Sequence, residues 1–405
     1  MPSLQLVKIF RSSWQRYRVW MVIAIATGLG GWAGWQWVQS QQKSQQESQN
    51  LADNPSDSPI PLPSALPRPL GSIKSPNEAR DDNKPPSPPP VPQMAAPQFQ
   101  IEQTFSGVGN SINSLALSPD NTNLITVSDY SKAVIWDLSQ ICEGEECQTP
   151  QKVLPMYSLW VYDVAINNSG DLAVGGSWNV VKVWDLVNGN IIRDIQVHFG
   201  SVYKVLLGAK MDTLVTASSD QTVKVWNLET GKLNQTFTGH NAPVQALAMS
   251  PDEKLLASGA TNGGIKVWSL EQNCFPESCK ESILTLSGHE KQVTALGITA
   301  DGKFLVSASA DQTVKIWDLG TGKLVHDIAA HTGSVLAIAM SPDGKFFASG
   351  STDQTIKLWE VSTGAFLGNL SSHSDAVHSL TFSKDGKLLI SGGNDRRINV
   401  WRRES

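Results

Sequence analysis

The 405-residue sequence has few of the residues on which site chemistry usually depends. It contains four cysteines and seven histidines, and it shows no glycine-rich phosphate loop, metal-ligand cluster or nucleophile elbow. The first cysteine is Cys142, which excludes a lipid-bearing cysteine near the N-terminus. Acidic residues (37) outnumber basic ones (32), and this argues against nucleic-acid binding because a phosphate-binding surface must be basic. We therefore expect no catalytic residue, no cofactor, no metal and no nucleic acid.

Charged residues are absent from one long run near the N-terminus, VWMVIAIATGLGGWAGWQWV at residues 19–38. An apolar helix of this length crosses the roughly 30 Å hydrocarbon core of a membrane, and its tryptophans lie near the two ends, where interfacial rings prefer to be. The alternatives are a cleaved signal peptide or a buried core helix. The run lacks a good cleavage site, and no adjoining segment could bury it. We predict a retained transmembrane helix at 19–38 after a basic cytoplasmic N-terminus at 1–18.

Basic residues lie mainly before this run, and their asymmetry predicts its orientation. Lys8, Arg11, Arg16 and Arg18 precede it, whereas Lys43 is the one nearby basic residue after it. Because the more basic flank stays in the cytoplasm, we expect the rest of the chain on the non-cytoplasmic (periplasmic or luminal) side. Within the run, a stripe of small residues lies on one helix face: Ala26, Gly30 and Gly34. Such a stripe lets two helices pack closely as a homodimer. The alternative is that it reflects only the glycine content usual in membrane helices.

Residues 39–98 have the composition of a linker. The part from 39 to 50 is rich in glutamine, and residues 51–98 hold fourteen of the 22 prolines, including KPPSPPPVPQ at 84–93. Such a segment cannot bury enough apolar surface to offset the entropy lost on ordering, so we predict a disordered spacer with polyproline-like stretches.

Seven copies of a short pattern ending in tryptophan occupy the remainder, residues 99–405. Its clearest copies are ADQTVKIWDL (310–319), SDQTVKVWNL (219–228) and TDQTIKLWEV (352–361). The tryptophans are separated by 48, 42, 42, 49, 42 and 42 residues, a period typical of four-stranded propeller units: Trp136, Trp184, Trp226, Trp268, Trp317, Trp359 and Trp401. This region resembles the WD-repeat family of β-propellers. The resemblance implies an all-β ring of seven four-stranded blades.

The resemblance also implies a buried hydrogen-bonded tetrad of His, Ser or Thr, Asp and Trp in each well-preserved repeat. Repeats three to seven supply these sets: His198, Thr216, Asp220 and Trp226; His240, Ser258, Asn262 and Trp268; His289, Ser307, Asp311 and Trp317; His331, Ser349, Asp353 and Trp359; His373, Ser391, Asp395 and Trp401. Ser, His and Asp also suggest a catalytic triad. Their repetition around the ring, always with a tryptophan, favours a structural role in which the polar groups satisfy one another.

The last blade needs an outer strand, since four residues follow Trp401. The segment FQIEQTFSG at 99–107 resembles the outer strand KLNQTFTG at 232–239. We therefore predict that strand 99–107 completes the seventh blade and removes an open sheet edge.

The two longest spacings come from insertions that each carry a cysteine pair, Cys142 with Cys147 and Cys274 with Cys279. A CxxxxC pair suggests zinc or a disulfide. Each loop offers two thiolates and no histidine, and repeats one and four lie nearly opposite on a seven-fold ring, so they cannot share one zinc. We predict two local disulfides, which are typical of non-cytoplasmic proteins.

Aromatic residues outside the repeat core are concentrated in repeats one to three. We predict that they form a partner-binding patch on one loop face: Tyr130, Tyr157, Trp160, Tyr162, Trp178, Phe199 and Tyr203. Tyr157 and Trp178 occupy the tetrad His and Asp positions of repeat two, so Trp178 is expected in a turn. The alternative is that these rings fill the cores of degenerate repeats.

These features together predict a non-catalytic, membrane-tethered scaffold that binds protein partners. The alternative is an exported enzyme or small-ligand receptor that uses the central channel. An enzyme would need acidic or histidine side chains on the strands facing the channel, and the strands VQALAM, VTALGI, VLAIAM and VHSLTF are almost entirely small or apolar. The sequence therefore favours partner binding.

Overall fold

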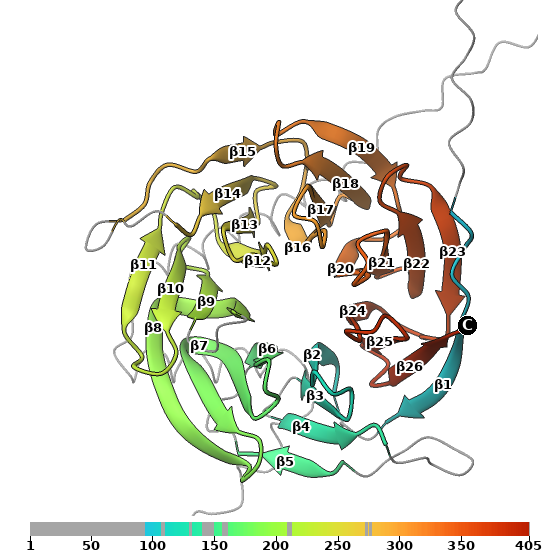
Figure 1. Cartoon of the computed structure of the whole chain (residues 1–405), viewed down its shortest axis with the longest axis horizontal. Helices are drawn as coiled ribbons and strands as arrows, with labels where there is room; N and C mark the ends of the chain where they lie inside the picture. Colours follow the sequence, from blue (N-terminus) through green and yellow to red (C-terminus); the bar gives the residue numbers. More distant parts are fainter. Residues whose placement is uncertain are drawn as a thin grey trace, which may run out of the picture. The chain divides into compact units, whose positions relative to one another are not determined.

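The computed structural model describes residues 94–404, except 107–109, 129–131, 140–149, 156–160, 209–212, 272–273 and 275–277. The described residues form twenty-six strands, which surround a central opening (Figure 1). Within them no helix is long and apolar enough to cross a membrane. The predicted transmembrane helix at 19–38 and most of the predicted linker lie outside the described residues.

The strands form six antiparallel sheets rather than the seven blades predicted. Five sheets have four strands, in these orders from the channel outward: β2 (Ile112–Leu117), β3 (Asn123–Ser128), β4 (Lys132–Asp137), β5 (Lys152–Leu154); β12 (Val244–Met249), β13 (Leu255–Ala260), β14 (Ile265–Ser269), β15 (Leu284–Leu286); β16 (Val293–Ile298), β17 (Phe304–Ser309), β18 (Thr313–Asp318), β19 (Leu324–Ala329); β20 (Val335–Met340), β21 (Phe346–Ser351), β22 (Thr355–Glu360), β23 (Phe366–Ser371); β24 (Val377–Phe382), β25 (Leu388–Gly393), β26 (Ile398–Arg403), β1 (Phe99–Phe105). The sixth has six strands: β6 (Val161–Ile166), β7 (Leu172–Asp185), β8 (Asn190–Leu207), β9 (Thr213–Ser218), β10 (Val223–Asn227), β11 (Leu233–Phe237).

The six-stranded sheet carries repeats two and three together, and this corrects the predicted blade count. Its strand β8 is 18 residues long. The first part of β8 pairs with β7, as an outer strand does, and the second part pairs with β9, as an inner strand does. The two parts are joined because Ser201 pairs with Trp178 of β7. A loop that separates sheets elsewhere is therefore part of the sheet here.

The first described strand closes the ring. β1 pairs antiparallel with β26, from Phe99 opposite Arg403 to Phe105 opposite Ile398. The N–H of Glu404 also donates to the carbonyl of Gln98. Met94 and Ala96 pack against the core cluster that contains Phe99, so packed structure begins before the predicted boundary at residue 99.

The core consists of clusters that lie between neighbouring repeats, and each holds one tryptophan of the repeat pattern. All seven of these tryptophans are at most 6% exposed. Alternating side chains on the strands bury apolar residues against both neighbours, which is what a ring of face-packed sheets requires.

Candidate functional site

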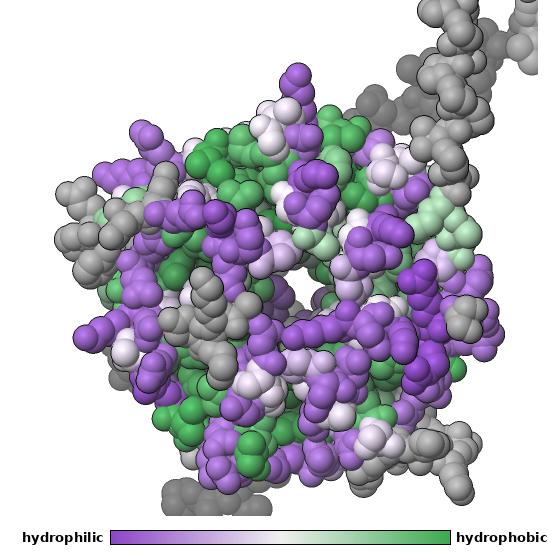
Figure 2. All heavy atoms as spheres, viewed as in Figure 1, coloured by the Kyte–Doolittle hydropathy of each residue, from purple (hydrophilic) through white to green (hydrophobic). Residues whose placement is uncertain are grey.

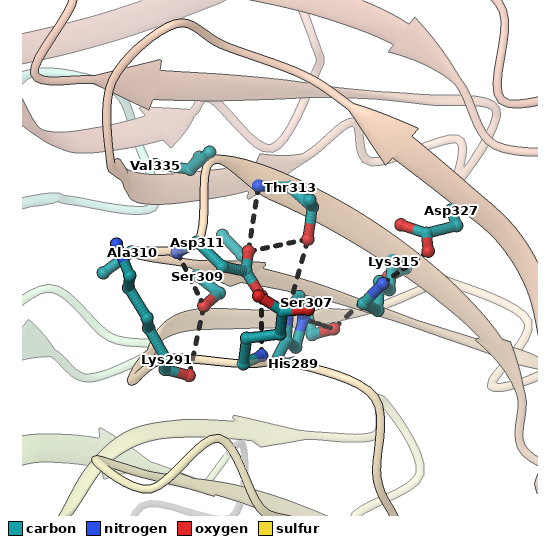
Figure 3. Close-up of polar contacts among 12 residues, drawn as sticks. His289, Lys291, Ser307, Ser309, Ala310, Asp311, Thr313, Lys315, Asp327 and Val335 are labelled. Atoms are coloured by element: carbon teal, nitrogen blue, oxygen red, sulfur yellow. Dashed lines mark hydrogen bonds and ion pairs between the residues drawn. The ribbon is translucent and has the colours of Figure 1, made fainter. Parts of the chain in front are cut away.

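The polar tetrads lie at one face of the ring, between the loop that precedes an inner strand and the turn that joins the second and third strands. We call this side the loop face. In repeat five, Nε2 of His289 lies 2.8 Å from Oγ of Ser307, which also accepts from Nε1 of Trp317 at 2.9 Å. Nδ1 of His289 lies 2.8 Å from the carboxylate of Asp311 (Figure 3). Repeats three, six and seven repeat all three contacts, with distances of 2.7–3.0 Å.

The tetrads of repeats three, five and six combine a neutral histidine with an ionised aspartate. Burial lowers the pKa of His289 and His331, although the nearby aspartates act in the opposite direction. Burial raises the pKa of Asp311, but hydrogen bonds from Thr313 and His289 outweigh it and hold the value at about 2. The imidazole can then donate from Nδ1 to the carboxylate and accept the hydroxyl proton at Nε2.

These tetrads are built for stability rather than for catalysis. The hydroxyl-bearing residues Thr216, Ser258, Ser307, Ser349 and Ser391 are all 0% exposed, so a substrate cannot reach them. Each hydroxyl already contacts a histidine and a tryptophan. A fully satisfied buried network of this kind fixes the geometry of the turn above it.

Repeat four lacks the carboxylate. His240 contacts Ser258 at 2.8 Å, but the amide of Asn262 donates instead to the side chain of Asn241. Burial, reinforced by the charge of Lys266, lowers the pKa of His240 to about 4.

Repeat two has lost its tetrad because its turn is one residue shorter. Ser177 pairs with Val161 as Ser218 pairs with Val202, but Ser177 lies seven residues before Trp184, whereas Ser218 lies eight before Trp226. A Cβ at Gly175, which occupies the tetrad hydroxyl position, would lie 2.6 Å from the ring of Trp184. Nε1 of Trp184 donates to the carbonyl of Pro155 instead.

This short turn exposes Trp178, which is 65% exposed. We expected Trp178 in an isolated turn, but the structure includes it in β7, where it pairs with Ser201. Along β8, Ser201 lies between Phe199 and Tyr203.

Phe199 follows the tetrad histidine His198 directly in β8, and its side chain is 98% exposed. Its N–H donates to Asp220, as the N–H of Glu290, Thr332 and Ser374 donates to the aspartate in repeats five, six and seven. The other three repeats therefore place a polar side chain in water at this position, and repeat three places a phenylalanine there. Nζ of Lys224 lies 5.9 Å from its ring centre.

Tyr162 and Tyr203 lie at the channel rather than in loops. Each stands at a bulge in an inner strand, where one residue is left unpaired and its side chain is redirected. Their rings meet edge to face with centres 5.3 Å apart, and both are half-buried. Of the predicted aromatic residues, Tyr162 and Tyr203 are in contact at the channel, and Trp178 and Phe199 are exposed; the other three lie outside the described part: Tyr130, Tyr157 and Trp160.

Beneath this tyrosine pair, the channel contains an ion pair that the sequence analysis missed. Asp163 is 2% exposed and lies 2.8 Å from Nζ of Lys204. It also accepts from Oγ of Ser114 at 2.6 Å and from the N–H of Val205 at 2.9 Å. The carboxylate thereby joins the inner strands of repeats one, two and three. The sequence does hold a sign of this ion pair. Asp163 and Lys204 are the third residues of the inner-strand sequences VYDVAI and VYKVLL, and the other inner strands have a small residue at that third position.

The channel forms a cavity of about 450 Å³ with two different sides. Repeats one to three and seven line it with polar side chains, whereas repeats four to six contribute mostly small and apolar ones: Ala246, Leu247, Ala295, Leu296, Leu336, Ala337 and Ile338. Figure 2 shows the central opening, whose edge on the face in view is largely hydrophilic.

A family model for the WD domain, G-beta repeat, matches seven segments of this chain, which together cover more than half of it: residues 99–137, 148–185, 189–227, 231–269, 280–318, 322–360 and 364–402. The chain belongs to the WD-repeat family. Each matched WD repeat begins with a strand that pairs with the tryptophan-bearing strand of the repeat before it, and ends with its own tryptophan-bearing strand. Consecutive WD repeats are therefore interlocked, since each completes the sheet before it.

Curated relatives match this WD-repeat chain over a shorter stretch. A protein named Small ribosomal subunit protein RACK1, from Dictyostelium discoideum, is 34% identical over 104 residues, which are 24% of this chain and 30% of that protein. The protein of the same name from Drosophila melanogaster is 29% identical over 97 residues, or 24% of this chain and 30% of its own. Cross-pathway control WD-repeat protein 2 of Flammulina velutipes is 26% identical over 102 residues, or 25% and 32%. The chain spans about a third of the length of the curated relatives it matches.

The insertion in the fourth WD repeat contains a disulfide between Cys274 and Cys279, and no described cysteine is free. Cys279 is 3% exposed and forms a bridge with Phe237 of β11 in the preceding repeat. The N–H of Cys279 donates to Thr236, and its carbonyl accepts from Thr238. The predicted pair Cys142–Cys147 lies outside the described residues.

Proposed function

We propose that this WD-repeat protein is a non-catalytic, membrane-tethered scaffold that binds protein partners through the loop face of repeats two and three. The exposed rings of Trp178 and Phe199 carry this surface, with Tyr162 and Tyr203 at the mouth of the channel. We assign the other predicted aromatic residues to the same surface: Tyr130, Tyr157 and Trp160. Membership of the WD-repeat family supports a binding role, and the name of the RACK1 relatives places those proteins in a larger assembly.

The observation that carries this proposal is the exposure of large rings at positions that are polar elsewhere. Phe199 stands where repeats five to seven carry Glu290, Thr332 and Ser374, and Trp178 stands in a turn too short for the tetrad aspartate. Neither ring is needed to fill the core, and leaving both in water costs free energy. Exposed aromatic rings are typical of protein-interaction surfaces.

The proposal is tested with Trp178→Ala and Phe199→Ala in the full chain. Each change should weaken partner capture by photo-cross-linking from membranes by at least about tenfold, since an aromatic hot spot contributes 2 kcal/mol or more. The melting temperature should stay the same. Ile192→Ala is the matched control, because Ile192 is 54% exposed on the outer part of β8. Unchanged capture in both aromatic variants, or an equal loss in the control, would disprove the proposed surface.

We assign the tether to residues 19–38 and the propeller to the non-cytoplasmic side. The basic flank at Lys8, Arg11, Arg16 and Arg18 supports this orientation. The disulfide at Cys274 and Cys279 supports an oxidising compartment. The small-residue stripe of Ala26, Gly30 and Gly34 would allow two tethers to associate as a homodimer.

A second candidate function, a small-ligand receptor in the channel, is favoured by one observation. The cavity of about 450 Å³ is within the range of small-molecule sites and combines the Asp163–Lys204 pair with an apolar wall. Lys204→Met should abolish ligand binding in that case while leaving partner capture intact. The scaffold proposal predicts instead that Trp178→Ala reduces partner capture more than Lys204→Met does.

A further inference from the structure

A groove of about 420 Å³ lies between repeats five and six on the face opposite the loop face. It is bounded by the turns that join the first and second strands, at Thr299–Phe304 and Asp343–Lys345. Its apolar lining comes from Met94, Phe304 and Val361; Val361 is 5% exposed and the other two are half-buried. Its charged lining consists of Asp301, Asp343 and Lys345 with the buried Glu360, whose carboxylate accepts from the hydroxyl of Thr363.

Met94, which lines this groove, is also the first described residue. The chain therefore enters the ring here, and the residues that immediately precede Met94 must start from the edge of the groove. Those residues are PPPVPQ at 88–93. In the polyproline II conformation a chain advances about 3.1 Å per residue, so a segment that ends at Met94 can bring Val91, three residues earlier, to any point within about 9 Å.

The chemistry of this segment matches that of the groove. Proline-rich segments in the polyproline II conformation dock on grooves lined by aromatic and apolar side chains, and they lose little entropy because they are already extended. Phe304, Met94 and Val361 provide such a lining, and none of residues 88–93 carries a charge that would have to be desolvated beside them.

We propose that residues 88–92 dock in this groove, with Val91 on the apolar lining. This goes beyond partner binding, because it defines a second, intramolecular binding site on the opposite face. The docked segment fixes where the chain leaves the ring.

The test uses the full chain in detergent and measures the hydroxyl-radical modification rates of Met94 and Phe304. Val91→Asp places a charge against the apolar lining and should lower the docked-to-free ratio about tenfold or more. The modification rates of both residues should then rise severalfold, while that of Met249 in β12 stays constant. Because residue 91 precedes the ring, the substitution should leave the melting temperature unchanged.

Leu62→Asp is the matched control, since it adds the same charge within the same proline-rich stretch. Docking is supported if the modification rates of Met94 and Phe304 rise in Val91→Asp and stay unchanged in Leu62→Asp. Equal rates in the wild type and Val91→Asp would overturn the proposal, as would equal rises in both variants. None of these outcomes depends on partner capture, so the groove and the loop face are tested separately.

Discussion

Repeat four has Asn262 at the position where repeats three, five, six and seven have an aspartate. This single difference should make the stability of repeat four fall at acidic pH. His240 has a pKa of about 4 in the folded state, lowered by burial and by Lys266, against about 6.5 when unfolded. The unfolded chain therefore binds the proton more tightly. The stability that this histidine contributes is complete above pH 6.5 and is lost as the pH falls towards 4, by up to about 3 kcal/mol.

Asn262→Asp should repair the tetrad. A carboxylate beside Nδ1 would raise the pKa of His240 towards its unfolded value, just as the hydrogen bond that His289 donates to Asp311 opposes the effect of burial on the pKa of His289. We expect about 1–2 kcal/mol more stability at pH 7 and a shallower loss between pH 6.5 and 4. Chemical denaturation at several pH values measures both. Asn262→Ala is the control, and it should show neither the higher stability at pH 7 nor the smaller loss of stability between pH 6.5 and 4.

The other residues of the site differ in how far the sequence could predict them. Tetrad members recur at fixed distances from a tryptophan, so the repeat pattern alone places them. The exposure of Trp178 depends on a turn shortened by one residue, which becomes visible only when strand register shows Ser177 opposite Val161. Asp163 and Lys204 were missed because their partners come from other repeats, and a contact between distant strands leaves no local pattern.

At the scale of elements, the disulfide of the fourth WD repeat should act as a clamp on the third. Cys279 bonds the backbone of β11 on both sides of Phe237, and the disulfide to Cys274 limits how far that segment can move. Replacing both cysteines by serine should lower the unfolding free energy by about 2 kcal/mol, the typical effect of closing so short a loop.

Hydrogen exchange locates that effect. The amides of Thr238 and Cys279 should exchange faster in the double serine variant because their shared bridge opens. The corresponding turn of repeat five, where the N–H of Gly322 donates to Asp318, has no cysteine and should exchange at the same rate in both proteins. Faster exchange at Gly322, or none at Thr238, would show that the disulfide does not act through β11.

The arrangement of elements was only partly predictable. The tryptophan period predicted four-stranded units, and the likeness of residues 99–107 to an outer strand anticipated the pairing of β1 with β26. The joined strand β8 was not foreseen. Its continuity depends on the pairing of Ser201 with Trp178, and cross-strand pairing of two loops is a tertiary property that periodicity does not encode.

At the scale of the whole molecule, the two ends of the described region and the aromatic site lie on opposite faces. Phe99 and Arg403 are opposite each other at one end of their strands, whereas the tetrad turns lie at the other end. A chain that enters beside Met94 therefore leaves Phe199 and Trp178 on the far side of the ring from its point of entry. This geometry suits a scaffold that captures partners away from its attachment.

The orientation proposed for the tether gives the last prediction. With Lys8, Arg11, Arg16 and Arg18 in the cytoplasm, protease added to the non-cytoplasmic side of sealed membrane vesicles should remove the propeller, while vesicles of the opposite orientation protect it. Thiol labelling before reduction should leave Cys274 and Cys279 unmodified in the same preparation, since an oxidising compartment preserves their disulfide. Replacing all four basic residues by glutamine should reduce the exported fraction, because the charge difference sets the orientation. Protection of the propeller together with four free thiols would place it in the cytoplasm, and a soluble product beginning after residue 38 would show that the apolar run is a cleaved signal.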